Sequence, residues 1–150
     1  MADFVFNIAK GRAIEMIADS PANCGIMLLK TAEAEETLKD RTTVEALTTA
    51  GGFGNVECDF TNYARKTALT GSVAVDNAPG NNFATADVAD QTWTAAGGAS
   101  NNNIVRAVVF YQNTAADTGR IPLTCHDFVV TTDGSDLTLQ VNAAGFYRAA

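Results

Sequence analysis

The feature that most constrains the fold is the stretch 103–150, which carries the densest run of strand-forming residues in the chain. Residues 104–111 and 121–131 are rich in β-branched and aromatic side chains, and turn-forming residues lie between them. Residues 137–141 alternate apolar with polar side chains and follow the sequence Asp-Gly-Ser-Asp, which favours a tight reversal. The pattern predicts a meander of three strands whose apolar face needs a second layer.

The N-terminal part of the chain is mostly helical in pattern. An apolar stripe within 8–17 predicts a short amphipathic helix with Asn7 as its N-cap. Residues 32–40 and 42–50 also have helical propensity, and a pair of glycines can close the second of these helices. The exception is the compact apolar run 25–29, whose length favours a buried strand over a helix.

The middle of the chain alternates short strand candidates with loops. Residues 56–60 and 63–69 predict strands that form either a hairpin or one bulged strand. The remaining segments are two weak strand candidates, 83–88 and 91–95, and two loops, 76–82 and 96–103. We expect the first of these loops to be a mobile surface loop.

These patterns predict one mainly β domain over residues 1–150, with helical elements mostly within 1–50 and a strand-rich part at 56–150. The expected architecture is an antiparallel β-sandwich or a partly closed barrel with short N-terminal helices. A chain of 150 residues is long enough to bury roughly two thirds of the surface that its unfolded form exposes. We expect its core to include these side chains: Val108, Phe110, Phe128, Val130, Leu137, Leu139 and Val141.

Charge and cysteine usage narrow the range of partners. The net charge is −7 and no cluster of Lys and Arg reverses it locally, which argues against nucleic acid. The three cysteines, Cys24, Cys58 and Cys125, have no zinc-ligand spacing and fit buried free thiols in a reducing cytoplasm. No apolar run approaches the roughly 18 residues of a membrane span, and the first residues lack the pattern of a secretory signal. We therefore expect synthesis in the cytoplasm without export, and no membrane partner.

The chain offers few groups for chemistry. His126, the one histidine, stands between Cys125 and Asp127, but neighbours in a strand point to opposite faces, so a nucleophile and its base would not meet. Four aspartates in turns could contribute oxygens to a calcium site, although such residues ordinarily bond their own backbone. These four are Asp87, Asp90, Asp133 and Asp136. The sequence also lacks phosphate-binding glycine motifs, and it predicts no catalysis, no metal and no organic cofactor.

Trp93 is the one large aromatic residue with two open roles. It either packs in the core, the role that we favour, or anchors an interface from beside a flexible loop. Exposed loops adapt to a neighbouring protein more readily than sheet faces do, so the two loops and both chain ends are candidate contact segments. The candidate interface residues are Trp93, Asn77, Pro79, Asn101 and Asn102.

Four segments carry a resemblance to a known class of proteins. They are MADFVFNIAKGR at the start, FTNYARK at 60–66, DQTWTAAGGASNN at 90–102 and IPLTCHDFVVTTDGSDLTLQVNAAGFYRA at 121–149. The chain resembles virion structural proteins of tailed bacteriophages, and among them the head decoration or cement proteins. The likeness spans nearly the whole chain, and its motifs identify no reacting group.

The resemblance implies a non-enzymatic subunit that binds the outer surface of a phage head. Such a subunit stabilises the head by bridging copies of the major capsid protein, and we expect it to self-associate as a dimer or trimer. Its place would be the capsid exterior of the virion after synthesis in the host bacterial cytoplasm. The alternatives are a tail or neck component of the virion and, less favoured, a cytoplasmic domain that binds a small ligand or acts as an enzyme.

Overall fold

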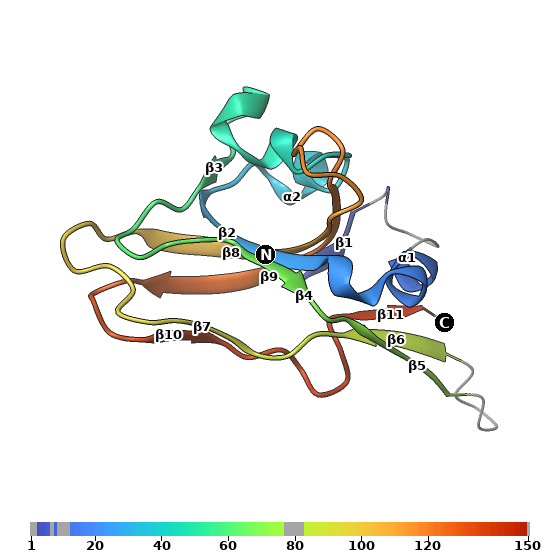
Figure 1. Ribbon diagram of the computed structural model, residues 1–150. Coiled ribbons are helices and arrows are strands. Elements are labelled where there is room, and N and C mark those ends of the chain that lie inside the picture. Colours follow the sequence, from blue (N-terminus) through green and yellow to red (C-terminus); the bar gives the residue numbers. More distant parts are fainter. Residues whose placement is uncertain (1–2, 7, 9–12, 77–82, 150) are drawn as a thin grey trace.

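The computed structural model describes residues 3–6, 8, 13–76 and 83–149. Its central antiparallel sheet has the strand order β1-β9-β8-β2-β3, and β4 pairs with the same edge of β2 as β3 does (Figure 1). The strands of this sheet are β1 (Phe4–Val5), β2 (Cys24–Thr31), β3 (Val56–Glu57), β4 (Lys66–Leu69), β8 (Asn103–Tyr111) and β9 (Ile121–Thr131).

Two smaller antiparallel sheets cover one face of the central sheet (Figure 1). One has the order β11-β6-β5 and the other pairs β10 with β7. Their strands are β5 (Ser72–Asp76), β6 (Phe83–Asp87), β7 (Gln91–Trp93), β10 (Leu137–Leu139) and β11 (Tyr147–Ala149). The chain is therefore mainly β and antiparallel, and its sheets form a sandwich rather than a closed barrel.

Short helical segments cover the opposite face of the central sheet (Figure 1). They include the α-helix α2 (Glu35–Leu38) and the 3-10 helices η3 (Glu45–Leu47) and η4 (Thr49–Gly51). The remaining helices are α1 (Ala13–Asp19), which packs against β5 and β6, and the 3-10 helix η2 (Pro21–Asn23). No helical segment follows η4 in the described residues, so the prediction of helices mostly within 1–50 is confirmed.

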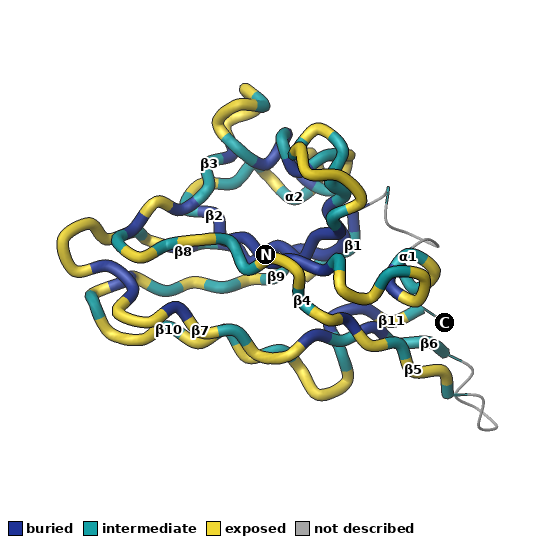
Figure 2. The backbone as a smooth tube through the Cα atoms, in the orientation of Figure 1, coloured by how far each residue is buried: buried dark blue, intermediate teal, exposed yellow. Residues whose placement is uncertain are grey.

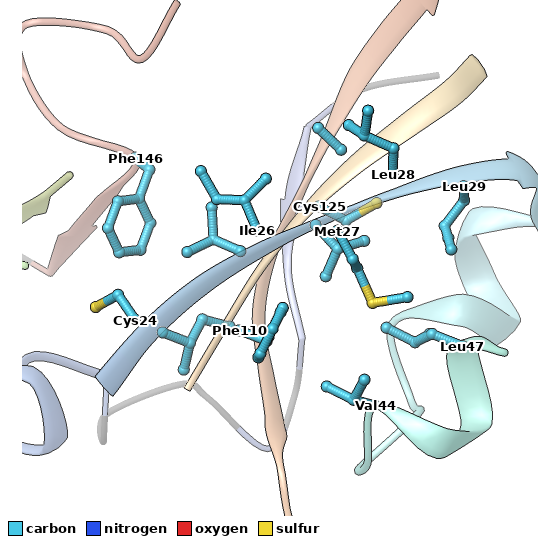
Figure 3. Packing of buried hydrophobic residues seen from close by; sticks show 14 of the residues in the cluster. Cys24, Ile26, Met27, Leu28, Leu29, Val44, Leu47, Phe110, Cys125 and Phe146 are labelled. Atoms are coloured by element: carbon cyan, nitrogen blue, oxygen red, sulfur yellow. The ribbon is translucent and has the colours of Figure 1, made fainter. Parts of the chain in front are cut away.

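The core is centred on β2 and β8, which are the most deeply buried strands (Figure 2). All six residues from Cys24 to Leu29 are buried, because both faces of the sheet are covered. Figure 3 shows Met27 pointing toward Val44 and Leu47 on the helical side, whereas Ile26 points toward Phe146 on the other. The apolar run 25–29, which predicted a buried strand, therefore lies in β2, a strand that is covered by other parts of the protein on both faces.

The predicted core residues divide into two groups. Val108 and Phe110 on β8 have no exposed surface. The other five are partly buried and pack against the core: Phe128, Val130, Leu137, Leu139 and Val141. These five belong to the end of β9 and to the segment around β10, where the sandwich is less completely covered.

The predicted three-stranded meander is wrong in its third strand. β8 and β9 pair as predicted, but β10 pairs with β7 and not with β9. The turn after β9 docks on the loop after β7 instead, because the N–H of Gly134 donates to the carbonyl of Ala96 at 2.8 Å and the N–H of Ala96 donates to the carbonyl of Ser135 at 2.8 Å. The carboxylate of Asp136 also accepts the N–H of Ala95 at 2.8 Å. These bonds carry the chain into the other layer of the sandwich.

The predicted helix over 42–50 is replaced by the two 3-10 helices η3 and η4. The N–H groups of Val44 and Glu45 donate to the carbonyls of Arg120 and Asp117, at 3.0 and 3.1 Å. The segment thereby bonds to the connection between β8 and β9 where a longer helix would begin. The helix predicted over 32–40 is also shorter, since α2 has only four residues.

The strands predicted over 56–60 and 63–69 do not form a hairpin. Both β3 and β4 pair with β2, at different positions along its edge. Their arrangement is closer to the second predicted alternative, one bulged strand, because β3 and β4 follow one another along that edge with shifts in register. The strand predictions over 83–88 and 91–95 are confirmed by β6 and β7.

Candidate functional site

A cleft of about 560 Å³ lies between the central sheet and the chain that connects β10 to β11. One wall comes from β8 and β9, the other comes from residues 138–146, and Asp3 contributes from directly before β1. The residues that line it are Asp3, Ala107, Val109, His126, Asp127, Phe128, Thr138, Leu139, Gln140, Val141, Asn142, Gly145 and Phe146. Such a volume falls in the usual range of ligand-binding pockets.

The register of the central sheet sets the first wall. Ala107 pairs with His126 and Val109 pairs with Thr124 across β8 and β9. Directly opposed residues share a face of the sheet, so small apolar side chains and the imidazole lie together on the face toward the smaller sheets. The first wall is therefore apolar on β8 and partly polar on β9.

A tight turn places Phe146 in the second wall. The N–H of Gly145 donates to the carbonyl of Asn142 at 2.7 Å, and the N–H of Phe146 donates to the carbonyl of Ala86 at 2.9 Å. Gly145 has a φ of 88°, and a Cβ there would lie 2.4 Å from the carbonyl oxygen of Ala86. Only glycine fits this turn without strain, because an L side chain rarely adopts such a φ and would collide with that oxygen.

Polar contacts join β1 to β9 beside the cleft. The imidazole Nδ1 of His126 lies 3.3 Å from a carboxylate oxygen of Asp3, and its Nε2 lies 2.9 Å from the hydroxyl of Thr124. The other carboxylate oxygen of Asp3 accepts the N–H of Asp127 at 2.9 Å. Burial raises the pKa of Asp3, but the bonds from Asp127 and His126 outweigh it and leave that pKa below its usual value. Asp3 is therefore a carboxylate at neutral pH.

A cross-strand ion pair stands beside this cluster. Arg106 and Asp127 pair in the register of β8 and β9, and the guanidinium of Arg106 donates to the carboxylate of Asp127. The side chain of Arg106 is only 3% exposed. Its charge is buried against its partner, so it is not presented to solvent.

The arrangement of Cys125 and His126 follows the sequence expectation. Cys125 pairs with Val108 and is fully buried, and burial raises the pKa of its thiol to about 12. The two ring nitrogens of His126 contact Asp3 and Thr124 instead of the thiol. Cys125 and His126 thus do not form an activated nucleophile with its base.

The aspartates considered for a calcium site bind backbone N–H groups instead. Asp133 accepts from Ser135, Asp87 from Val88 and Asp90 from Val141, and Asp136 accepts from Ala95. In the part of the chain that the structure describes, no group of three or more His, Cys, Asp or Glu residues is placed to hold a metal ion.

Of the two roles open to Trp93, the structure shows core packing. Its side chain is 2% exposed, and its indole N–H donates to the carbonyl of Ala64 at 2.8 Å. Asn101 and Asn102 hold the loop before β8: Asn101 accepts from the N–H of Gly98 at 2.7 Å and Asn102 from the N–H of Asp59 at 2.7 Å. Asn77 and Pro79, with most of the loop predicted to be mobile, lie outside the described residues.

Among the described residues, three large hydrophobic side chains are exposed, and the sequence analysis singled out none of them. Phe53 is 48% exposed, Val75 is 63% exposed and Val129 is 81% exposed. Phe53 follows η4 between two glycines with φ of 73° and 86°, and the guanidinium of Arg41 lies 3.7 Å from its ring centroid. An aromatic residue between glycines, in the sequence Gly-Gly-Phe-Gly, was the signal that could have revealed it.

No helix among the described residues has the length and hydropathy needed to cross a membrane. No protein-family model, curated protein or solved structure matches the chain.

Proposed function

We propose that the protein is a capsid cement protein, which binds the outside of a bacteriophage head and bridges copies of the major capsid protein. The resemblance in sequence motivates the proposal. The observation that carries it is the placement of the three exposed hydrophobic side chains, Phe53, Val75 and Val129, on three different parts of one compact scaffold. A subunit with separate contact points can touch more than one neighbour.

The three contact points belong to different layers of the fold. Phe53 lies in the helical cover of the central sheet, directly after η4. Val75 lies on β5, an edge strand of the smaller sheet β11-β6-β5, and Val129 lies on β9. Figure 1 shows the helical cover, the β5–β6 end and the C-terminal end of β9 in three different regions of the molecule.

Separate contacts strengthen a shell through avidity. Once one contact point is bound, binding at the next becomes intramolecular, so modest patches combine into firm attachment. Each bridging subunit then resists separation of the shell proteins that it joins. Internal pressure from packaged DNA pulls those proteins apart, and many bridges in parallel raise the load at which the shell fails.

The scaffold suits a subunit that must resist mechanical stress. The core is continuous from α1 through β2 and β8 to Phe146, and ion pairs tie distant segments together at the surface. The net charge of −7 keeps the free subunit soluble and favours approach to basic patches on a shell. We also propose that the subunit self-associates as a dimer or trimer, which would multiply its contact points.

The test compares particles that contain the protein with particles that lack it. Both are heated or osmotically shocked while DNA release is followed, and we expect release at a lower temperature or a milder shock without the protein. Equal thresholds, or a position inside the shell by electron microscopy, would overturn the proposal. The number of copies per particle distinguishes the alternative, a tail or neck component. Such a component forms one small ring, whereas the copy number of a cement protein increases with the number of shell subunits.

A further inference from the structure

We propose that the cleft between β9 and the β10–β11 connection binds an extended segment of another polypeptide. The segment would carry apolar residues at alternate positions and a lysine or arginine at the end that lies beside Asp3. This inference does not rest on the cementing role, because the cleft would bind such a segment whichever protein carries it.

The cleft has an apolar floor that suits one face of a strand. Val109 on β8, Leu139 on β10 and Phe146 before β11 converge on it from three elements, and Phe128 and Val141 add to the same lining. Successive side chains of an extended chain point to opposite sides. One set would therefore cover this floor, while the other set faces solvent.

Strand edges with unused pairing capacity border the cleft. β1 pairs with β9 only at Thr124 and Cys125, and no described strand pairs with the outer edge of β9 from Phe128 to Thr131. On the other wall, β10 has β7 as its only strand partner within the described residues. Unpaired N–H and C=O groups at such edges accept an added strand, and pairing of the main chain supplies affinity without regard to sequence.

Val129 lies on the same part of β9, outside the lining of the cleft, and adds exposed apolar surface next to it. Its side chain is 81% exposed, although valine is a residue that sheets normally bury at least in part. The register of β8 and β9 shifts between Ile104 and Arg106, so that an extra residue of β9 stands opposite Val105. A bulge of this kind re-aims side chains at a sheet edge.

Charge selects a basic segment. Asp3 and Asp127 line the cleft, and the side chain of Asp3 is 60% exposed. No lysine or arginine is among the described residues that line it, and the buried guanidinium of Arg106 is directed to Asp127. Asp3 contacts the imidazole of His126 but stays largely exposed, so an ammonium or guanidinium group beside it would be attracted more than an anionic group.

The test titrates the full-length protein with two synthetic hexapeptides, blocked at both ends, and follows backbone amide signals by NMR at low salt. One peptide is Lys-Val-Thr-Val-Thr-Val, and the other has Glu in place of Lys. We expect saturable shifts of the amide signals of β9 beyond Asp127, of β10 and of Phe146. The Lys peptide should bind about threefold or more tightly than the Glu peptide, as expected for one partly exposed ion pair.

Two variants assign the preference to one carboxylate. Asp3→Asn keeps an acceptor for the N–H of Asp127 but removes the charge, so it should abolish the difference between the peptides. The matched control Asp19→Asn, on the exposed surface of α1, should leave the difference unchanged.

Several outcomes would overturn the inference. They are the absence of a saturable shift, shifts confined to other parts of the chain, and equal binding of the two peptides by the unmodified protein. Concentration-dependent shifts of the same amide signals without peptide would also overturn it, in favour of a contact between folded copies of this chain. None of these outcomes bears on whether particles with the protein resist heat better, so failure here is distinguishable from failure of the cementing role.

Discussion

The guanidinium of Arg65 and the carboxylate of Asp117 form an ion pair of 2.7 Å across 52 positions of sequence. Arg65 also donates to Glu57 through two nitrogens, at 2.7 and 2.6 Å, and Arg120 donates to the same oxygen of Asp117 at 2.8 Å. The phenol of Tyr63 donates to Glu57 at 2.7 Å. This cluster joins the edge strands β3 and β4 to the connection between β8 and β9.

Replacing Asp117 by asparagine should destabilise the protein. The variant leaves two partly buried guanidinium groups without their shared carboxylate, and we expect a loss of about 2 kcal/mol in the free energy of unfolding. Urea denaturation at neutral pH measures the loss. Asp19→Asn, on the exposed face of α1, is the control and should change stability by less than about 0.5 kcal/mol. Equal effects of the two substitutions would contradict the importance of the cluster.

The same carboxylate should give stability a dependence on acid pH. Burial raises the pKa of Asp117, but the hydrogen bond from Arg65 and the nearby charges outweigh it, so the folded-state pKa is lowered. A lowered folded-state pKa means that the stabilisation is complete above the unfolded pKa of about 3.9 and is lost as pH falls through the folded value. The Tm difference between the unmodified protein and Asp117→Asn should therefore shrink as pH falls below about 4. A difference that stays constant down to pH values at which both remain folded would argue against this assignment.

Gly25 and Phe110 should show strong coupling in a double-mutant cycle. The two residues pair across β2 and β8, and a Cβ on Gly25 would lie 2.4 Å from the Phe110 ring. Gly25→Ala should cost about 1–3 kcal/mol through overpacking, and Phe110→Leu should relieve much of that cost by removing ring atoms. Denaturant unfolding of the two single variants and the double variant gives the coupling energy. Additive effects would show that the sheet yields elsewhere.

Local patterns in the sequence were sufficient for elements whose burial depends on their own residues. The run at 25–29 predicted β2 and the stretch at 104–111 predicted β8, because side chains buried on both faces leave an apolar record in the sequence. The β-branched and aromatic residues of 121–131 predicted β9. Pairing partners leave no such record. β10 was correctly expected near 137–141, but its pairing with β7 depends on the backbone bonds that join Gly134 and Ser135 with Ala96, a residue about forty positions earlier.

The candidate site was beyond prediction for the same physical reason. Its cleft brings together Asp3, His126, Leu139 and Phe146, which are spread over nearly the whole chain, and no motif links them. The sequence could indicate only a local relationship: Cys125 and His126 are neighbours in a strand and therefore point to opposite faces. Phe53 was predictable only in part. Its flanking glycines indicated a turn, but nothing in the local sequence indicated that the guanidinium of Arg41 stacks on its ring.

The three cysteines should be unreactive while the protein is folded. Burial raises the pKa of Cys24 to about 11 and the pKa values of Cys58 and Cys125 to about 12. The thiolate is the reactive form, so a disulfide reagent at pH 8 should modify none of them in the native state and all three in urea. Fast modification of a single thiol without denaturant would show that its surroundings open locally.

Phe53 should be required for attachment to the shell but not for folding. Its ring is 48% exposed and contacts the guanidinium of Arg41, which is itself held by the carboxylate of Glu33. Phe53→Ser removes the apolar surface while leaving the core untouched, so the free energy of unfolding should change by less than about 1 kcal/mol. If the ring anchors the contact, affinity for particles stripped of the protein should fall about tenfold or more.

Phe53→Tyr keeps the ring and should bind as the unmodified protein does, and sedimentation of the three proteins with stripped particles measures the difference. Unchanged binding of Phe53→Ser would move the contact to other parts of the surface, whereas a parallel loss with Phe53→Tyr would mean that the phenylalanine ring fits a pocket too tight for an added hydroxyl.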